Sequence, residues 1–487
     1  MTTQFTASGL EKIDEWRWRV PRRGAMKVPG LIFATDELMK TIAVDKAIEQ
    51  VINVAQLPGI VGHSIAMPDI HWGYGFPIGG VAAFDVESGV ISPGGVGYDI
   101  NCGVRLLASR ILGTDVSPKI LNQLISGLFA AIPTGVGRGR KDVKLSAHEL
   151  RQVAEQGAGW MVRKGFGAPA DLEHTETNGC IAGADFSQVS EKAVARGADQ
   201  VGTLGSGNHF CEVQIVDKIY DSSAASAFGL EKGCVVVLIH TGSRGFGYQV
   251  CEDAIETMMD AATKYRIVLP DKQLCCAPLH SPEAKAYMGA MASAANFAFA
   301  NRQMITQKVR GVFETVFGEG NSRKDSLRVV YDVAHNIAKM EDHVVDGELK
   351  RVCVHRKGAT RSLPAGHKDT PTAYKHVGQP VIVPGDMGTA SYVLVGQMGA
   401  LMESFGSCCH GAGRAMSRHE ALKSARKRNV ERELRDKGIV VMATGRGTLG
   451  EEMPEAYKNV SQVVSAVHGA NLAKTVAKLR PIGCIKG

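Results

Sequence analysis

The chain has 487 residues, of which 44% are hydrophobic and 22% are charged, and its formal net charge is +7. These values are ordinary for a globular protein with a large core, and 11 cysteines in so long a chain exclude a disulfide scaffold. No run of 18 apolar residues occurs, so we predict no transmembrane helix and no membrane partner.

The N-terminal sequence MTTQFTASGLEKIDEWRWRV has no apolar signal-peptide core, so we predict reduced thiols and a cytoplasmic location. The moderate positive charge permits an anionic partner without requiring one. Basic residues cluster in segments 16–23, 138–144, 355–361 and 418–437. We predict that the first three are loops able to contact phosphates, and that the fourth is the solvated face of a helix.

Short β-rich runs, bounded by glycine, proline or polar turns, predict strands over residues 81–86, 211–216, 234–240, 327–335, 351–355 and 380–383. Helical patterns between them include residues 284–309 and 415–437. Because strands and helices do not alternate strictly, a doubly wound parallel sheet is disfavoured. We predict an α+β fold: a single compact domain over residues 1–487, with packed mixed β-sheets at its centre and helices outside.

The segment SPGGVGYDINCGVRLL, residues 92–107, places Asp99 and Cys102 three residues apart among glycines. Glycine gives this loop unusual backbone freedom. The two side chains are either part of a turn with a buried thiol or two ligands directed at one point. The loop alone does not decide between these readings.

Three histidines lie at the edges of predicted strands: His209 precedes one, and His240 and His335 each end one. A single histidine there is more often a hydrogen-bonded structural residue than a ligand. Imidazole, carboxylate and thiolate are all donors to divalent metals, so the histidines, Asp99 and Cys102 form a candidate metal site. The donor types suit zinc at least as well as manganese or iron, and they allow one ion or two.

The segment CCHGAGRAMSRHEALKSARKR, from Cys408, places His410 before Gly-Ala-Gly-Arg and a helical pattern. A helix N-terminus after small residues binds anions, and Arg414 adds a fork for phosphate oxygens. His410 is then either a nucleophile toward phosphorus or a cap on a tight turn, and the pattern alone favours the cap. The glycine-rich stretch 202–212 is a weaker candidate phosphate cradle.

Further motifs occur along the chain: PDIHWGYGFPIGG, LGSGNHFCEVQ, IHTGSRG, VAHNIAK, VHRKGATR, GTASYVL, HGAGRAMSR and the terminal LRPIGCIKG. Together with SPGGVGYDINCGVRLL, they closely resemble one family, the RtcB family of GTP-dependent RNA-splicing ligases. The similarity runs from about Gly59 to the last residue, and residues 1–54 are less family-like.

The resemblance implies an enzyme that uses GTP and two Mn²⁺ ions to join an RNA 3′-phosphate or 2′,3′-cyclic phosphate end to a 5′-hydroxyl end. The family's metal ligands match Asp99, Cys102, His209, His240 and His335, with Cys102 bridging two ions. His410 matches the residue that takes GMP covalently, and Arg244 and His71 are candidate RNA-phosphate contacts. The implied GTP contacts are Asn208, His209, Phe210, Cys211, Glu212, His335, Asn336, Pro384, Gly385, Asp386, Met387, Ser391, His410, Gly411, Ala412, Gly413 and Lys486.

One residue departs from the family pattern: Asp386 stands where many members carry serine or threonine. A carboxylate there either accepts from the guanine N1–H and N2–H₂ edge or faces solvent. Two other functions stay open on the residues alone, a metal-dependent phosphoesterase and a non-catalytic RNA-binding protein. The physiological RNA, the oligomeric state and the need for an activating protein partner are also left open.

Overall fold

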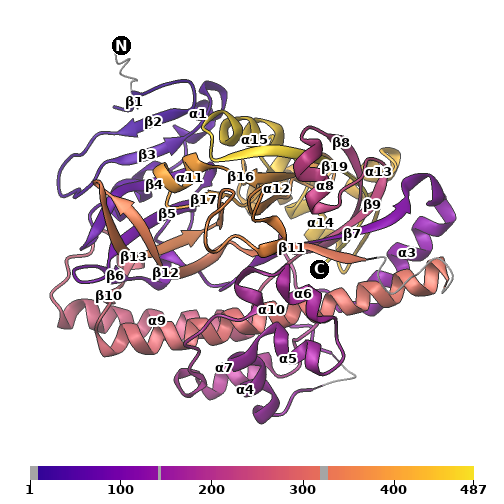
Figure 1. Ribbon diagram of the computed structural model, residues 1–487, viewed down its shortest axis with the longest axis horizontal. Helices are drawn as coiled ribbons and strands as arrows, with labels where there is room; N and C mark the ends of the chain where they lie inside the picture. The colour runs from indigo at the N-terminus through magenta and orange to yellow at the C-terminus, as the bar shows by residue number, and fades with distance from the viewer. Residues whose placement is uncertain (1–8, 141–143, 319–326) are drawn as a thin grey trace.

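Two mixed β-sheets form the centre of the computed structural model, which describes residues 9–140, 144–318 and 327–487, and helices cover them (Figure 1). This arrangement confirms the predicted α+β class with packed sheets inside and helices outside. Within the described residues, no helix combines the length and the apolar character needed to cross a bilayer.

The first sheet has seven strands in the order β1-β2-β3-β4-β5-β13-β12. It is mostly antiparallel, but β3 and β4 are parallel. Alternate residues of β5 enter different cores: Val81 and Ala83 pack on one face and Ala82 and Phe84 on the other. Its strands are β1 (Glu11–Lys12), β2 (Arg17–Val20), β3 (Gly30–Phe33), β4 (Ile60–His71), β5 (Ile78–Asp85), β12 (Asn336–Val345) and β13 (Glu348–Lys357).

The second sheet has eight strands, seven in the order β11-β7-β9-β8-β19-β16-β15 and β18 parallel to β19. Its interior strand β9 (Cys234–Thr241) is buried on both faces, which explains its continuous apolar sequence. The other strands are β7 (Gly103–Leu112), β8 (Phe210–Ile219), β11 (Arg328–Ala334), β15 (Pro380–Val383), β16 (Ser391–Gly396), β18 (Val440–Ala443) and β19 (Ala473–Lys486). Two smaller pairs join β6 (Val90–Ile91) to β10 (Ala277–Pro278) and β14 (Ala359–Arg361) to β17 (Ser407–Cys409).

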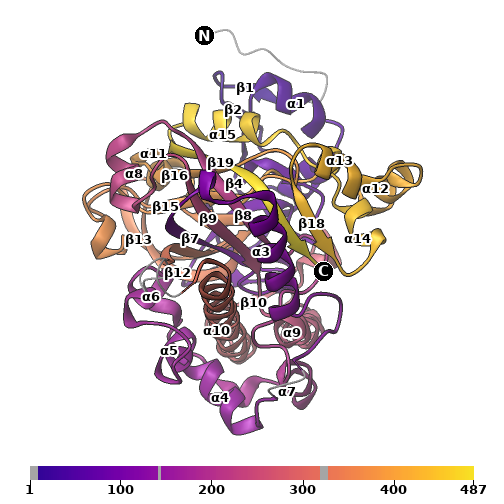
Figure 2. The same cartoon turned by 90° about the vertical axis from the view of Figure 1, so that its right-hand side faces the viewer.

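The long helix α10 (Pro282–Phe317) runs beside α9 (Arg244–Lys264), and the short helices α4 (Ala147–Gln156), α5 (Ala158–Arg163) and α7 (Glu191–Gly197) lie on their far side from the sheets (Figure 2). Ser281 caps α10 and Pro282 occupies its first turn, so the predicted helix 284–309 lies inside a longer one. The remaining helices are α1 (Asp36–Ile42), α2 (Ala47–Val54), α3 (Pro118–Ala131), α6 (Pro169–Glu173), α8 (Ser222–Phe228), α11 (Met398–Glu403), α12 (Arg418–Ala425), α13 (Val430–Asp436), α14 (Arg446–Glu451) and α15 (Val460–Gly469).

Three expectations about local structure are wrong. The helical pattern 415–437 forms two helices, α12 and α13, because Asn429 accepts a hydrogen bond from the Arg432 N–H and starts a new one. Basic segments 16–23 and 355–361 contain strands instead of being loops. In the second of these, Arg356 is buried and donates to both oxygens of Glu341, so it is not available to a phosphate. Residues 141–143 of the basic segment 138–144 lie outside the described residues.

Candidate metal centre and nucleotide pocket

The ends of neighbouring antiparallel strands meet at one edge of the eight-stranded sheet. Gly103, which begins β7, pairs with Ala334 at the end of β11 and with Thr241 at the end of β9. Phe210, which begins β8, pairs with His240 of β9 and with Lys486 of β19. This register brings Cys102, His209, His240 and His335 together, although they are up to 233 residues apart in sequence.

The donor atoms of this cluster form two groups that share one sulfur atom. Cys102, His240 and His335 form one group, and Asp99, Cys102 and His209 form the other, with the donor atoms of each group within 4.8 Å of one another. Cys102 Sγ lies 3.4 Å from His209 Nε2 and 3.3 Å from His240 Nε2. His240 Nε2 lies 3.2 Å from His335 Nε2, and His209 Nε2 lies 2.9 Å from Asp99 Oδ2.

The protonation states of this cluster suit a cation. Burial lowers the pKa of His240 and of His335 well below the usual imidazole range, so both rings are neutral and their nitrogens can donate lone pairs. Burial alone would raise the pKa of Asp99, but His209 and Arg244 outweigh it and lower that pKa. The pKa of the Cys102 thiol is raised by burial and by Asp99, and a bound metal reverses such a shift. The convergence of uncharged nitrogens, a thiol and a carboxylate therefore fits one or two divalent metals.

Hydrogen bonds from neighbouring elements fix the glycine-rich loop that carries Asp99 and Cys102. Asn101 has a left-handed backbone (φ 51°), and Arg302 of α10 donates to its carbonyl and to its side-chain oxygen. The Ser243 N–H donates to Asp99 Oδ1 at 3.0 Å. Residue 242 must be glycine, because a Cβ there would lie 2.4 Å from the Asp99 carboxylate. The loop is thus a rigid support for the two ligands.

His410 follows β17 and lies directly beside the cluster. Its ring centroid is 4.8 Å from that of His335. His410 Nδ1 is 2.7 Å from Oδ2 of the fully buried Asp69, which also accepts from the backbone N–H groups of His410 and Gly411. These contacts fix the loop and turn Nδ1 toward Asp69, so Nε2 is the ring nitrogen left for chemistry.

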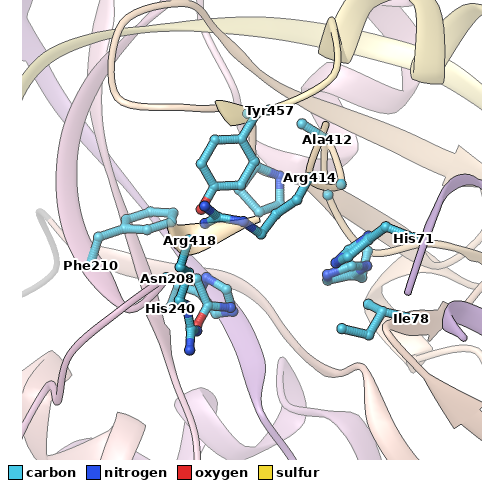
Figure 3. A pocket seen from close by; sticks show the side chains of 14 residues that line it. His71, Ile78, Asn208, Phe210, His240, Ala412, Arg414, Arg418 and Tyr457 are labelled. Atoms are coloured by element: carbon cyan, nitrogen blue, oxygen red, sulfur yellow. The ribbon is translucent and has the colours of Figure 1, made fainter. Parts of the chain in front are cut away.

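His410 is one of the residues that line a pocket (Figure 3). Arg414, Arg418 and Tyr457 are grouped on one side of it, and His71 and Ile78 lie on another. Burial lowers the pKa of His71 to about 3, so its ring is neutral near pH 7. The residues that line the pocket are His71, Ile78, Asn208, Phe210, His240, Pro384, Gly385, His410, Gly411, Ala412, Gly413, Arg414, Arg418 and Tyr457.

Several other predicted nucleotide contacts form a buried layer next to this pocket. Lys486 is held in β19 at the C-terminus of the chain, 3.5 Å from Glu452 Oε2 and 5.6 Å from the Phe210 ring centroid. Gln214 donates to Ser391 at 2.9 Å and also to Glu212. Burial raises the pKa of Glu212 to about 8. Arg244 lies beside His209, and its buried Nε has no hydrogen-bond partner among the residues that the structure describes.

Four of the predicted contacts are directed elsewhere or already engaged. The Cys211 side chain packs in the core on the opposite face of β8, and Met387 packs in an apolar core. Both ends of the Asn336 amide are used inside the protein, on the Asp99 carbonyl and the Gly358 N–H. Asp386 accepts from the Gly388 N–H and the Thr389 hydroxyl of its own loop.

The sequence analysis missed or misjudged some residues of this site. Asp69 stands in the motif PDIHWGYG, but nothing in its spacing connects it with His410, 341 residues away. Arg418, which begins the basic segment predicted to be a solvated helix face, lines the pocket, and so does Tyr457, which belongs to none of the motifs. Arg414 was predicted to grip phosphate, yet it also forms an ion pair with Glu452 at 3.0 Å.

The sequence matches the profile of the family described as "tRNA-splicing ligase RtcB" over residues 50–487. A relative of that name from Thermococcus kodakarensis is 52% identical over 480 residues, which cover 98% of this chain and 99% of the relative. Another from Archaeoglobus fulgidus is 51% identical with the same coverage. An "RNA-splicing ligase RtcB" from Mycobacterium tuberculosis is 50% identical over 439 residues, 90% of this chain and all of its own.

Proposed function

This chain belongs to the RtcB family of tRNA-splicing ligases and is an RNA ligase, and we propose that it joins RNA 3′-phosphate or 2′,3′-cyclic phosphate ends to 5′-hydroxyl ends by using GTP. His410 is the nucleophile that carries GMP in this proposal. The single observation that carries it is the position of His410, which is held by Asp69, contacts His335 of the metal cluster and faces the pocket. The names of the relatives make tRNA the first RNA to test, and a cytoplasmic location belongs to the same proposal.

Asp99, Cys102, His209, His240 and His335 are the residues that would hold two Mn²⁺ ions, with Cys102 shared between them. Divalent ions bound there would neutralise phosphate charge and polarise the phosphorus atom under attack. The donor types alone also suit zinc, so the preference for manganese rests on the family resemblance.

The first step uses the geometry of His410. With Nδ1 turned toward Asp69, the Nε2 lone pair attacks the α-phosphorus of GTP. A P–N bond forms, the bond from that phosphorus to the bridging oxygen breaks, and pyrophosphate leaves. Asp69 stabilises the positive charge that develops on the imidazole, as the aspartate of a Ser-His-Asp triad does for its histidine.

The later steps transfer the activated group to RNA. An oxygen of the RNA 3′-phosphate attacks the His410-bound GMP and releases the histidine. The 5′-hydroxyl of the second RNA then attacks the 3′-phosphorus, a phosphodiester forms and GMP leaves. Arg244, whose buried Nε has no partner among the described residues, and His71, which lines the pocket, are the proposed contacts to RNA phosphate. The nucleotide contacts implied by the resemblance remain part of this proposal. Those that line the pocket, from Asn208 to Gly413, lie nearest the reacting groups.

Radiolabelled GTP tests the assignment of the nucleophile. The wild-type protein should acquire a label that is lost in acid and retained in alkali, because a phosphoramidate has that stability. His410→Ala should acquire no label and should not join 3′-phosphate ends, but it should still join an RNA that already carries a 3′-diphosphoguanosine end. A label on His410→Ala, or an acid-stable label, would assign the nucleophile elsewhere. A wild type that is never labelled but removes phosphate from RNA ends would be the phosphoesterase.

A further inference from the structure

Three tyrosines from separate elements contact one another beside the metal cluster. The ring centroids of Tyr74 and Tyr98 are 5.4 Å apart in an edge-to-face contact. Those of Tyr98 and Tyr248 are 4.8 Å apart and stacked. The guanidinium of Arg196 lies over the Tyr248 ring, 5.5 Å from its centroid. We call these three tyrosines with Arg196 the tyrosine row.

The tyrosine row is continuous with the candidate active site. Tyr98 directly precedes the metal ligand Asp99 in the chain, and Tyr248 lies one turn after Arg244 on α9. Trp72 belongs to the loop that carries Tyr74, and it directly follows His71, which lines the pocket. A strand whose terminal phosphate reaches Arg244 and the metal cluster can therefore place its next nucleotides beside these rings.

The side chains of Tyr248 and Trp72 are exposed to solvent, although packing of the fold does not require this exposure. Among the described residues, Tyr248 is 42% exposed and Trp72 is 46% exposed, and the only other aromatic side chain with comparable exposure is Tyr220 at 47%. Large aromatic side chains normally bury their surface, and exposed groups of them mark binding sites. Two of the three exposed aromatic residues thus lie beside the candidate active site.

Side-chain hydrogen bonds hold the loops of the tyrosine row. Gln50 binds both the N–H and the carbonyl of Gly73, and the Gln273 side chain accepts from the Gly75 N–H. Between them, the buried ammonium of Lys357 donates to the Tyr74 carbonyl and to the Gly94 carbonyl, 3.0 Å away. One side chain therefore ties the loop of Tyr74 to the loop that leads to Tyr98. Such preorganised aromatic rings lose little entropy when a ligand stacks on them.

We propose that the tyrosine row and Trp72 stack the nucleobases that adjoin the 3′-phosphate end of a single-stranded RNA. This inference rests on the proposed function for the identity of the ligand. Aromatic side chains and guanidinium planes are the groups on which proteins stack splayed bases, and they do so with little dependence on sequence. At the outer end, Arg196 and Lys192 lie 3.7 and 3.9 Å from the single carboxylate of Glu252, which offsets part of their positive charge.

Fluorescence anisotropy with a short fluorescein-labelled oligoadenylate that ends in a 3′-phosphate tests this surface directly. Tyr248→Ala should raise the Kd about tenfold, because one stacked base is lost, and Tyr248→Phe should bind as the wild type does. Trp72→Ala should also weaken binding. Tyr220→Ala is the matched control: Tyr220 is equally exposed and has Lys218 over its ring, but it lies just beyond the far end of β8 from Phe210.

Abasic RNAs separate base stacking from a structural effect. With abasic nucleotides at the 3′ end, wild type and Tyr248→Ala should bind equally, whereas abasic nucleotides at the 5′ end should preserve the difference. Equal losses on intact and 3′-abasic RNA, or no loss on either, would overturn the proposal and leave the surface to the sugar–phosphate backbone or to a protein partner. Labelling of His410 by GTP, which needs no RNA, reports separately on the proposed function.

Discussion

Two groups of buried polar side chains meet at the same sheet edge, and they are satisfied to different degrees. In the first, Asp332 accepts from Arg105 and from Arg302, and all three side chains are fully buried. We call it the arginine network. Every guanidinium nitrogen in it is hydrogen-bonded: Arg105 also binds Gln303, Thr306 and Thr175, and Arg302 also binds the carbonyls of Asn101 and Thr241. Nothing in it is left for a ligand.

The second group, the metal cluster, is arranged in the opposite way. Its imidazole Nε2 atoms face one another and a thiol, and among the described residues Nδ1 of His240 and of His335 has no hydrogen-bond partner. Buried polar groups are nearly always paired, so a convergent set of nitrogen, sulfur and carboxylate donors fits a divalent cation. This contrast separates a structural group from a candidate binding site. The arginine network fixes the loop that carries Asp99 and Cys102, and that loop positions these two members of the metal cluster.

The largest expected effect comes from removing the shared ligand. Cys102→Ser should lower the manganese content of the purified protein and slow GTP labelling by more than about 10³-fold, because both donor groups lose their common sulfur. The serine hydroxyl is a poor ligand near neutral pH. Metal analysis and the labelling rate measure this, and the unfolding midpoint of the metal-free protein should not change.

Cys180→Ser is the control for that substitution, because Cys180 is a free thiol outside the cluster. It should behave as the wild type does. If Cys102→Ser kept the wild-type metal content and labelling rate, the distinction between the two buried groups would fail at its first test.

Breaking the arginine network should act on stability first. Arg302→Met leaves the carbonyls of Asn101 and Thr241 unpaired and removes one partner of the buried Asp332, so the free energy of unfolding should fall by about 3–5 kcal/mol. Denaturant titration of the metal-free protein measures this change. A variant of undiminished stability that has lost metal binding would place Arg302 in the site itself.

A third prediction concerns pH. Burial alone would raise the pKa of Glu176, but Lys339 and Arg361 outweigh it and lower that pKa to about 2. Because this folded-state pKa lies below the unfolded value of about 4.3, the stabilisation is fully present above pH 4.3 and is lost as the pH falls toward 2. Between about pH 5 and pH 3, the wild type should lose about 2 kcal/mol more unfolding free energy than Glu176→Gln. If the unfolding free energies of the two proteins fell equally between pH 5 and pH 3, this assignment would be contradicted.

The smallest expected effect concerns Asp386, whose carboxylate is partly used within the protein and partly free for a ligand. Burial raises its pKa, and its oxygens already accept from Thr389 and Gly388. We expect Asp386→Ala to reduce the preference for GTP over ATP in labelling by less than about tenfold, because only the remaining lone pairs are free for guanine. Thr389→Val, which removes a loop contact but keeps the carboxylate, should preserve the preference. An unchanged preference in Asp386→Ala would limit this residue to shaping its loop.

Much of this arrangement is predictable from local sequence. The predicted strands at residues 234–240, 327–335 and 380–383 agree with β9, β11 and β15, because apolar β-branched runs between turn residues have few other stable conformations. The histidines at strand ends also made a site shared with Asp99 and Cys102 a candidate, although the glycine-rich loop alone left the role of these two residues open. The donor types did not name the metal, and the motif around His410 by itself favoured a structural turn.

The sequence by itself therefore determined the α+β class, the strand segments and the set of ligand candidates, because these depend on side-chain type and short spacing. Only the tertiary structure decided which distant groups meet. It turned His410 toward Asp69, occupied Arg356 and Arg414 with glutamates, and brought Tyr74, Tyr98 and Tyr248 into one row. Such pairings follow from strand register and helix packing across hundreds of residues, where a side chain's partner is fixed by the fold and leaves no mark on its neighbours in the chain.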